Sequence, residues 1–526
     1  MSNVSHPLLD DADQPGWWGW IDRNTERGTR FLNPILIKEA RQALKSKQFG
    51  VTFFLLLLAS WFWMVIGVVM ASPDIYYVPS GVYLMTGYFL LLSVPMIAMV
   101  PLAAHRSLAA ELDEGTFELL AITKLSALRI VTGKLGSAVL QMLVYFAALV
   151  PAFGFCYLLR GIDLVMISLT LGLVFMASLL LTTFGLLLAT AVQNKAGQIF
   201  ALLFLLFCIL MAEVFCGSFA IGVVMAQQLT WEVGSFNFLL LFGAVAISFM
   251  VLFVQAAAAR IAPVTENRST RLRWIMFIQQ LLWVAAMAGA AFYDNDAEIL
   301  FFGIVMLGAY WTLMGTLMLG ESAELSPRVL RTMPQTTFGR MMLLWLCPGP
   351  GTGFMFAILS AIAGIATLSS VVIVFGKIAG SSNPVMTSGI VVGYLMMYLG
   401  ATRLIVLPLS RRIGNSFLLP VSVMVILLVL GVVTPSIFMA ITTGAPSSQY
   451  GAQEFTNWMW TLSESSGSRF AFGVEMSAFL IAVIGGGLFV LNLFLLVREF
   501  SYRRVSVPAR VAADDQEQSS VVALGE

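Results

Sequence analysis

Residues 51–71, VTFFLLLLASWFWMVIGVVMA, form an uncharged apolar run that exceeds the roughly 18 to 20 residues a helix needs to cross a bilayer. Of the 526 residues, 59% are hydrophobic and only 11% are charged, and the mean hydropathy is +0.90. Soluble globular domains carry roughly 25% charged residues. The apolar runs do not alternate with polar residues, as the strands of a membrane β-barrel would. The sequence therefore predicts an all-α, polytopic integral membrane protein.

Hydropathy over a window of about 19 residues predicts about twelve transmembrane helices. They form two groups of six, divided by a basic loop at 259–273 that contains Pro263. Each group has a charged segment after its second span, but the two segments differ in motif, so an internal repeat stays open. The predicted spans are 51–71, 81–104, 135–159, 164–190, 199–225, 237–258, 274–293, 299–319, 353–376, 388–410, 416–441 and 474–497.

This division predicts five parts of the chain. They are an N-terminal tail at 1–50, a first membrane domain at 51–258, a linker at 259–273, a second membrane domain at 274–497 and a disordered polar tail at 498–526. Of the 29 Lys and Arg residues, 25 fall on the side of the membrane that also holds both termini. Basic residues near span ends are retained in the cytoplasm. Both termini are therefore expected to be cytoplasmic.

A short amphipathic helix is expected before the first span. Asn33 can cap a helix that begins at Pro34, a residue favoured at the first helical position. In ILIKEARQALKSKQF, apolar residues lie near one helical face, and Lys38, Glu39 and Arg41 lie largely around the other side. We expect this helix to lie on the membrane surface, although a plain basic extension of the first span is the alternative.

The most distinctive charged segment is 105–134, HRSLAAELDEGTFELLAITKLSALRIVTGK. Its glutamates are spaced three and four residues apart and can share one helical face. Gly115 permits a bend, Thr116 can cap a short amphipathic helix, and Ser126 can cap the helix that enters the third span. The sequence predicts a short, rigid element held against the membrane at both ends.

Residues in this segment resemble the signature of ABC-2 type transporter permeases. The matching motifs are Glu111-x-x-Glu114-Gly115-Thr116-x-Glu118-Leu119-Leu120, Thr123-Lys124-Leu125-Ser126 and Gly133-Lys134-Leu135. The helix that begins at Asn33-Pro34 is similar to the connector helix of that family. Lys124 departs from the family, which usually has proline there. The resemblance covers about residues 33–260 and does not extend by motif into the second half.

The resemblance implies the membrane subunit of an ATP-binding cassette exporter, in the bacterial cytoplasmic (inner) membrane. ATP would be used by a separate ATPase subunit, and no cofactor would be bound directly. No G-x-x-x-x-G-K-[ST] phosphate loop occurs in the sequence. A solvated loop whose charges only orient the protein is the alternative. The residues that the resemblance places at the ATPase contact are Glu111, Glu114, Gly115, Thr116, Glu118, Leu119, Leu120 and Lys124.

Two charged residues inside predicted spans, Glu213 and Arg403, are candidates for a translocation path. Glu213 could instead mark a re-entrant turn, and Arg403 is expected to extend towards the cytoplasmic end of its span. Gln141, Gln279, Gln280 and Asn492 are expected to form hydrogen bonds between helices.

An ion-coupled secondary transporter with twelve spans is the alternative function, and Glu213 is its best titratable group. Direct catalysis is not expected, because the chain has just His6 and His105 as histidines and no cluster of metal ligands. Nothing in the sequence predicts a nucleic-acid partner. The transported substrate and the oligomeric state, including a homodimer, are left open.

Overall fold

The computed structural model describes residues 33–114, 126–191, 195–225, 233–263, 266–321, 344–375, 383–413, 418–443, 450–466 and 472–502. In these ranges all regular structure is helical, and twelve helices are long and apolar enough to cross a membrane. The protein is therefore an all-α, multi-pass membrane protein, as predicted. Its contacts divide the chain into two units, Met1–Ala262 and Pro263–Glu526. Their boundary falls in the loop between the sixth and seventh candidate spans.

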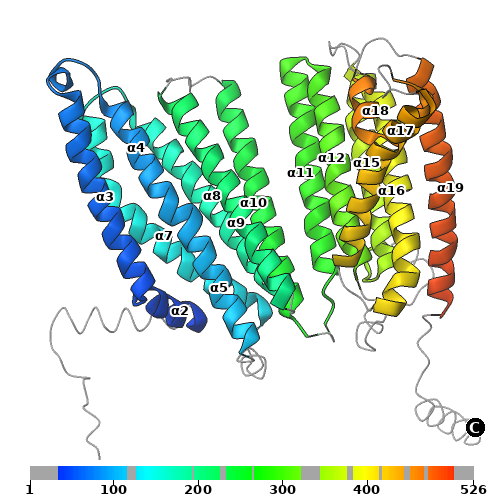
Figure 1. Ribbon diagram of the computed structural model, residues 1–526, viewed down its shortest axis with the longest axis horizontal. Coiled ribbons are helices and arrows are strands. Elements are labelled where there is room, and N and C mark those ends of the chain that lie inside the picture. The colour runs from blue at the N-terminus through cyan, green and yellow to red at the C-terminus, as the bar shows by residue number, and fades with distance from the viewer. Residues whose placement is uncertain are drawn as a thin grey trace, which may run out of the picture. The chain divides into compact units, whose positions relative to one another are not determined.

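The first unit is a bundle of long helices with one short helix, α2, lying crosswise at the end of the bundle (Figure 1). Its buried core comes mainly from α4, α5, α7 and α8, while α3 and α9 keep many large apolar side chains exposed. The elements are α2 (Pro34–Leu44), α3 (Lys47–Ala71), α4 (Gly81–Ser93), η3 (Val94–Met99), α5 (Val100–Asp113), α7 (Ala127–Leu158), α8 (Leu164–Ala191), α9 (Lys195–Phe219), η4 (Ala220–Met225) and α10 (Val233–Ile261).

The second unit is also a helix bundle, with α16 packed against α12, α15, α17 and α19. Its first two spans are joined by a tight turn, in which Asn295 adopts a left-handed conformation and the Asp296 side chain caps the next helix. The elements are α11 (Thr270–Asp294), α12 (Ala297–Leu319), η5 (Leu344–Leu346), α15 (Pro350–Phe375), α16 (Pro384–Ile413), α17 (Leu418–Thr443), η6 (Ala452–Glu454), α18 (Trp458–Ser465) and α19 (Phe472–Tyr502).

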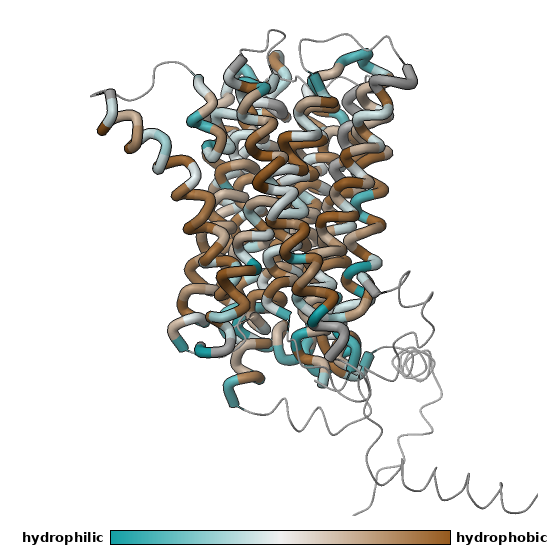
Figure 2. Tube along the Cα trace, turned by 90° about the vertical axis from the view of Figure 1, so that its right-hand side faces the viewer, coloured by the Kyte–Doolittle hydropathy of each residue, from teal (hydrophilic) through white to brown (hydrophobic). Residues whose placement is uncertain are grey.

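Hydropathy along the helices matches a membrane setting. Hydrophobic residues dominate the middle of the helices and hydrophilic residues gather towards their ends (Figure 2). Association of helices in lipid depends on close packing and hydrogen bonds, because lipid tails are as apolar as the side chains they meet. The exposed apolar faces of α3 and α9 are those expected of lipid-facing helices.

The second candidate span contains a π-helical segment, η3, between α4 and α5. Pro95 and Pro101 lie in or just after this segment, and proline cannot donate a backbone hydrogen bond. The hydroxyl of Ser178 donates to the carbonyl of Met96. Such side-chain donors stabilise helix irregularities in lipid by satisfying the exposed backbone.

The structure moves several boundaries of the predicted spans. The second span was expected to end at 104, but α5 continues to Asp113. The third was expected to begin at 135, but α7 begins at Ala127, where the Ser126 side chain caps it as predicted. Charged residues in these added turns lowered the hydropathy, although the backbone stays helical. The two helices therefore extend beyond the apolar region towards the segment 115–125.

Candidate functional site

The helix before the first span begins where the sequence predicts. The Asn33 side chain accepts a hydrogen bond from the backbone N–H of Ile35, and Pro34 occupies the first helical position. The side-chain amide of Asn33 also donates to the carbonyl of Arg129, near the start of α7. One residue therefore both starts α2 and attaches it to α7.

Two glycines allow α2 to pack closely on α7. A Cβ atom at Gly133 would lie 2.9 Å from the Cβ of Ile35, and one at Gly136 would collide with the side chain of Leu36. Glycine and other small residues permit such close backbone approach between membrane helices. Gly133 therefore lets α2 lie close to α7, and this short distance allows Lys134 to form an ion pair with Glu39 of α2.

Lys134 is the centre of an ion-pair cluster that joins α2, α5 and α7. Its side chain is only 2% exposed, and its Nζ lies 3.2 Å from Glu39 Oε2 and 3.1 Å from Glu111 Oε2. The same Nζ donates to the hydroxyl of Ser107 at 2.7 Å, and that hydroxyl donates to Glu39 at 3.1 Å. Lys38, at the surface, lies 3.6 Å from Glu111. Each buried charge is thus compensated by an opposite charge, as burial requires.

The burial of Glu39 corrects one expectation about α2. Counting along an isolated helix placed Glu39 on the polar side, yet the residues buried on α2 are Ile35, Glu39 and Ala40. On the apolar face expected from the sequence, Ala40 is buried, Leu36 and Ile37 are half-buried, and Leu44 is exposed. Glu39 is buried rather than exposed to solvent because it forms an ion pair with Lys134 on α7. The sequence of α2 alone does not show this partner.

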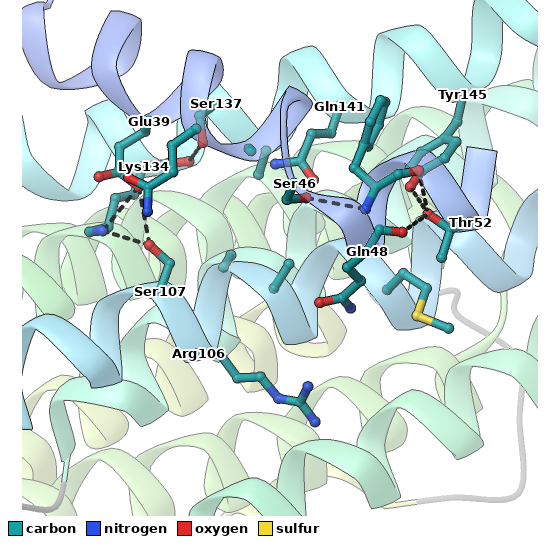
Figure 3. Close-up of a pocket in the computed structure, with 17 residues that line it drawn as sticks. Glu39, Ser46, Gln48, Thr52, Arg106, Ser107, Lys134, Ser137, Gln141 and Tyr145 are labelled. Carbon is teal, nitrogen blue, oxygen red and sulfur yellow. Dashed lines mark hydrogen bonds and ion pairs between the residues drawn. The ribbon is translucent and has the colours of Figure 1, made fainter. Parts of the chain in front are cut away.

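A cavity of about 290 Å³, lined by both apolar and polar side chains, lies beside this cluster, between α2, α3, α5 and α7. Figure 3 shows the Lys134 cluster at one end of the cavity and the pair Thr52 and Tyr145 at the other. The hydroxyls of Thr52 and Tyr145 are joined by a hydrogen bond of 2.6 Å. Gln48 and Gln141 lie between these two ends, and Arg106 projects from α5 away from the cluster. The cavity combines polar groups with the ring of Phe49, which lies 5.2 Å from the ring of Tyr145.

Of the residues expected to contact an ATPase, the structure describes Glu111 and Glu114. Glu111 lies in the last turn of α5, and its side chain is 17% exposed because it pairs with Lys134. Glu114 follows as the C-cap of α5 and is exposed. The two glutamates therefore differ in environment, the first turned towards α7 and the second accessible. The remaining predicted contacts, Gly115, Thr116, Glu118, Leu119, Leu120 and Lys124, lie outside the described residues.

Glu213 lies within α9, a regular helix at this position, so a re-entrant turn at Glu213 is excluded. Its Oε2 accepts a hydrogen bond of 2.8 Å from Ser93, the last residue of α4 before the π-helical segment. Its Oε1 is buried without a hydrogen-bond partner among the described residues. A carboxyl group so placed is a possible proton-binding group, because burying a charged carboxylate in an apolar region is costly.

Arg403 is held inside the second unit rather than extended to the membrane surface. It is 2% exposed, and its guanidinium donates to the carbonyl oxygen of Asn492 at 2.9 Å. The same group lies 5.5 Å from the centre of the Phe354 ring. The expectation that Arg403 extends to the end of its span is therefore wrong. Glu213 and Arg403 belong to different units.

The predicted interhelical hydrogen bonds are largely confirmed. The hydroxyl of Tyr310 donates to Gln279, the indole of Trp311 donates to Gln280, and the amide of Asn492 donates to the carbonyl of Gly400. Gln141 differs, because its amide makes no hydrogen bond within the described ranges and lines the cavity beside the Lys134 cluster instead.

Arg273 is a buried charge that the sequence did not single out. It is 0% exposed and lies 2.7 Å from Glu321 at the end of α12. It also donates to the carbonyl oxygens of Trp345, Cys347 and Gly349, in the turn before α15. Arg273 stands directly at the start of a predicted span among other basic residues, so its charge was assigned to membrane orientation. Its many partners indicate a structural role.

Comparison of the chain with protein-family models, with curated proteins and with solved structures gives no match.

Proposed function

We propose that this chain is the membrane subunit of an exporter of the ABC-2 type, moved by a separate ATP-hydrolysing subunit. The observation that carries the proposal is the Lys134 cluster, which joins the surface helix α2 to α5 and α7. In the sequence, α5 and α7 flank the segment 115–125, whose motifs resemble the permease signature. In this proposal the α2 side of the first unit faces the cytoplasm.

The cluster gives the proposed partner a means of moving the membrane helices. Glu111 is four residues before Gly115 and is paired through Lys134 with α7, the next long helix. Charged groups buried together resist separation, because breaking a buried pair costs about 3–5 kcal/mol. Force applied at Glu114 would therefore displace α5, α7 and α2 together. This is the behaviour expected of a coupling element between an ATPase and a transport path.

Association with an ATPase tests this proposal. The full chain, purified from its native membrane under mild conditions, should copurify with a protein that contains a phosphate-binding loop and hydrolyses ATP. Replacing Glu114 and Glu118 with lysine should abolish that association, because it reverses two of the negative charges in the motif that resembles the permease signature. Asp163→Lys is the control, since Asp163 is exposed in the turn that joins the other end of α7 to α8. Association that survives the double substitution would remove the proposed contact.

An ion-coupled secondary transporter is the second candidate, favoured by one observation. The partly buried carboxyl of Glu213 accepts a hydrogen bond from Ser93 beside a π-helical segment, and such segments are frequent at functional sites. An ion-coupled carrier needs a titratable group inside the membrane. The two candidates differ in whether a purified transporter responds to ATP or to an ion gradient.

A further inference from the structure

The two units contain equal numbers of candidate spans. The boundary at Ala262 leaves six of the twelve spans in each unit. In chain order, the spans of the first unit are α3, α4 with α5, α7, α8, α9 and α10, and those of the second unit are α11, α12, α15, α16, α17 and α19. Each span of the first unit therefore has a counterpart in the second.

The same spans pack against each other in both units. In each, the second span packs against the first, third, fourth and fifth, the fourth also against the third, fifth and sixth, and the third also against the first and sixth. The fifth and sixth spans follow each other in the sequence, yet their described residues do not pack closely in either unit. Consecutive elements usually lie side by side, so both units share an exception as well as a pattern. Such agreement indicates one fold, used twice.

A tryptophan joins the first span to the second in each unit. In the first unit, the indole N–H of Trp63 donates to the carbonyl of Leu84 at 3.0 Å, 21 residues later. In the second unit, the indole N–H of Trp283 donates to the carbonyl of Gly303 at 3.1 Å, 20 residues later. An indole N–H within a span needs an acceptor from the protein, because lipid tails offer none. Both units meet this need with the same residue type at nearly the same spacing.

A glutamate holds the end of the second span to the start of the third in each unit. Glu111, at the end of α5, pairs with the buried Lys134 of α7 at 3.1 Å. Glu321, just after α12, accepts a hydrogen bond of 2.6 Å from the backbone N–H of Gly349, which directly precedes α15. Its buried basic partner is Arg273, at 2.7 Å. The basic residues come from different helices, but both glutamates lie at the same place in the fold.

We propose that the second unit repeats the fold of the first, so that the chain is a fused pair of six-span units and acts as a single copy. Many transporters contain repeats that each supply half of the membrane part. A chain with one such unit needs a second copy to form a symmetric pair, whereas this chain contains both units. The helix α2 is an addition to the first unit, because the described residues before α11, 266–269, are not helical. The repeat stands on the packing alone, and assembly of this single copy with an ATPase rests on the proposed function.

The copy number in native membranes tests the proposal. Two full-length versions that differ only in a C-terminal affinity tag are co-expressed, and the membranes are extracted directly into polymer-bounded nanodiscs. Purification through one tag should recover the other only at the level seen when separately expressed membranes are mixed after extraction. A homodimer formed at random from equal amounts would carry both tags in about half of its particles. Native mass spectrometry should show one chain of 57.3 kDa, plus its tag, in each particle.

The outcomes separate the fused pair from the proposed function. Recovery of the second tag well above the mixing control, or particles with two copies of the chain, would overturn the fused pair, whether or not an ATPase is bound. One copy together with an ATP-hydrolysing partner supports both the fused pair and the exporter. One copy without such a partner supports the fused pair and counts against the exporter.

Discussion

The ammonium nitrogen of Lys134 lies 3.1 Å from a carboxylate oxygen of Glu111, and this contact joins the end of α5 to the first turns of α7. Both residues stand within the charged segment 105–134, on opposite sides of the undescribed residues 115–125. The ion pair therefore joins the two described ends of this segment.

Removal of the buried lysine should destabilise the first unit. Lys134→Met leaves the carboxylates of Glu39 and Glu111 without their buried partner, and loss of one member of a buried ion pair costs about 3–5 kcal/mol. We expect a clear fall in the melting temperature of the purified protein in detergent. Lys38→Met is the control, because Lys38 is 62% exposed and such surface pairs contribute about 0–1 kcal/mol. A similar melting temperature for Lys134→Met and the wild type would contradict a structural role for the cluster.

Substitution of the close-contact glycine should displace α2. A side chain at Gly136 would collide with Leu36, and overpacking of this kind costs about 1–3 kcal/mol. In a background without native cysteines, spin labels at Arg41 and Leu128 should report a longer and broader distance distribution for Gly136→Leu. Gly154→Leu is the matched control on the same helix, since a Cβ there meets no atom within 4 Å. Equal distributions for the two variants would show that α2 does not need this contact.

The sequence predicted the parts of the site that depend on neighbouring residues. Asn33 and Pro34 define the start of α2, and Ser126 caps α7, because capping acts over two or three residues. The twelve spans follow from local hydropathy. These features need no knowledge of the tertiary structure.

The parts that depend on distant residues were missed or wrong. Glu39 is buried because Lys134, far along the chain, compensates its charge, and amphipathic counting on α2 has no access to that partner. Arg403 is buried because α19 supplies the carbonyl of Asn492. One signal could have indicated the cluster: Gly133 and Gly136 mark a face of α7 that another helix can approach, and Lys134 lies between them. A lysine on such a face is a candidate for a buried pair.

Loss of the buried arginine should loosen the second unit. Arg273→Met removes the ion pair with Glu321 and the donors to the turn before α15, so we expect about 3–5 kcal/mol of destabilisation. Faster proteolytic cleavage near residues 345–349 should accompany it. Arg271→Met serves as the comparison, because Arg271 is exposed two residues earlier. The role assigned to Arg273 fails if both variants are cleaved at the wild-type rate.

Neutralisation of Glu213 separates the two candidate functions. Glu213→Gln keeps an oxygen that can accept the hydrogen bond from Ser93, so the fold should be retained. If ATP drives the transporter, hydrolysis by the copurified complex should be unchanged and should not require a proton gradient. An ion-coupled carrier would instead lose gradient-driven transport with this substitution. Loss of gradient-driven transport in Glu213→Gln would therefore favour the second candidate.

The contact with an ATPase is the central claim, and a photocrosslinking amino acid placed at Glu114 tests it most directly. Glu114 is exposed at the end of α5, so the substitution should leave the Lys134 cluster intact. Illumination of native membranes should give an adduct that mass spectrometry identifies as a protein with a phosphate-binding loop. The same probe at Arg160, exposed at the opposite end of α7, should give none. Absence of an ATPase adduct at Glu114, or equal amounts at both positions, would contradict the account.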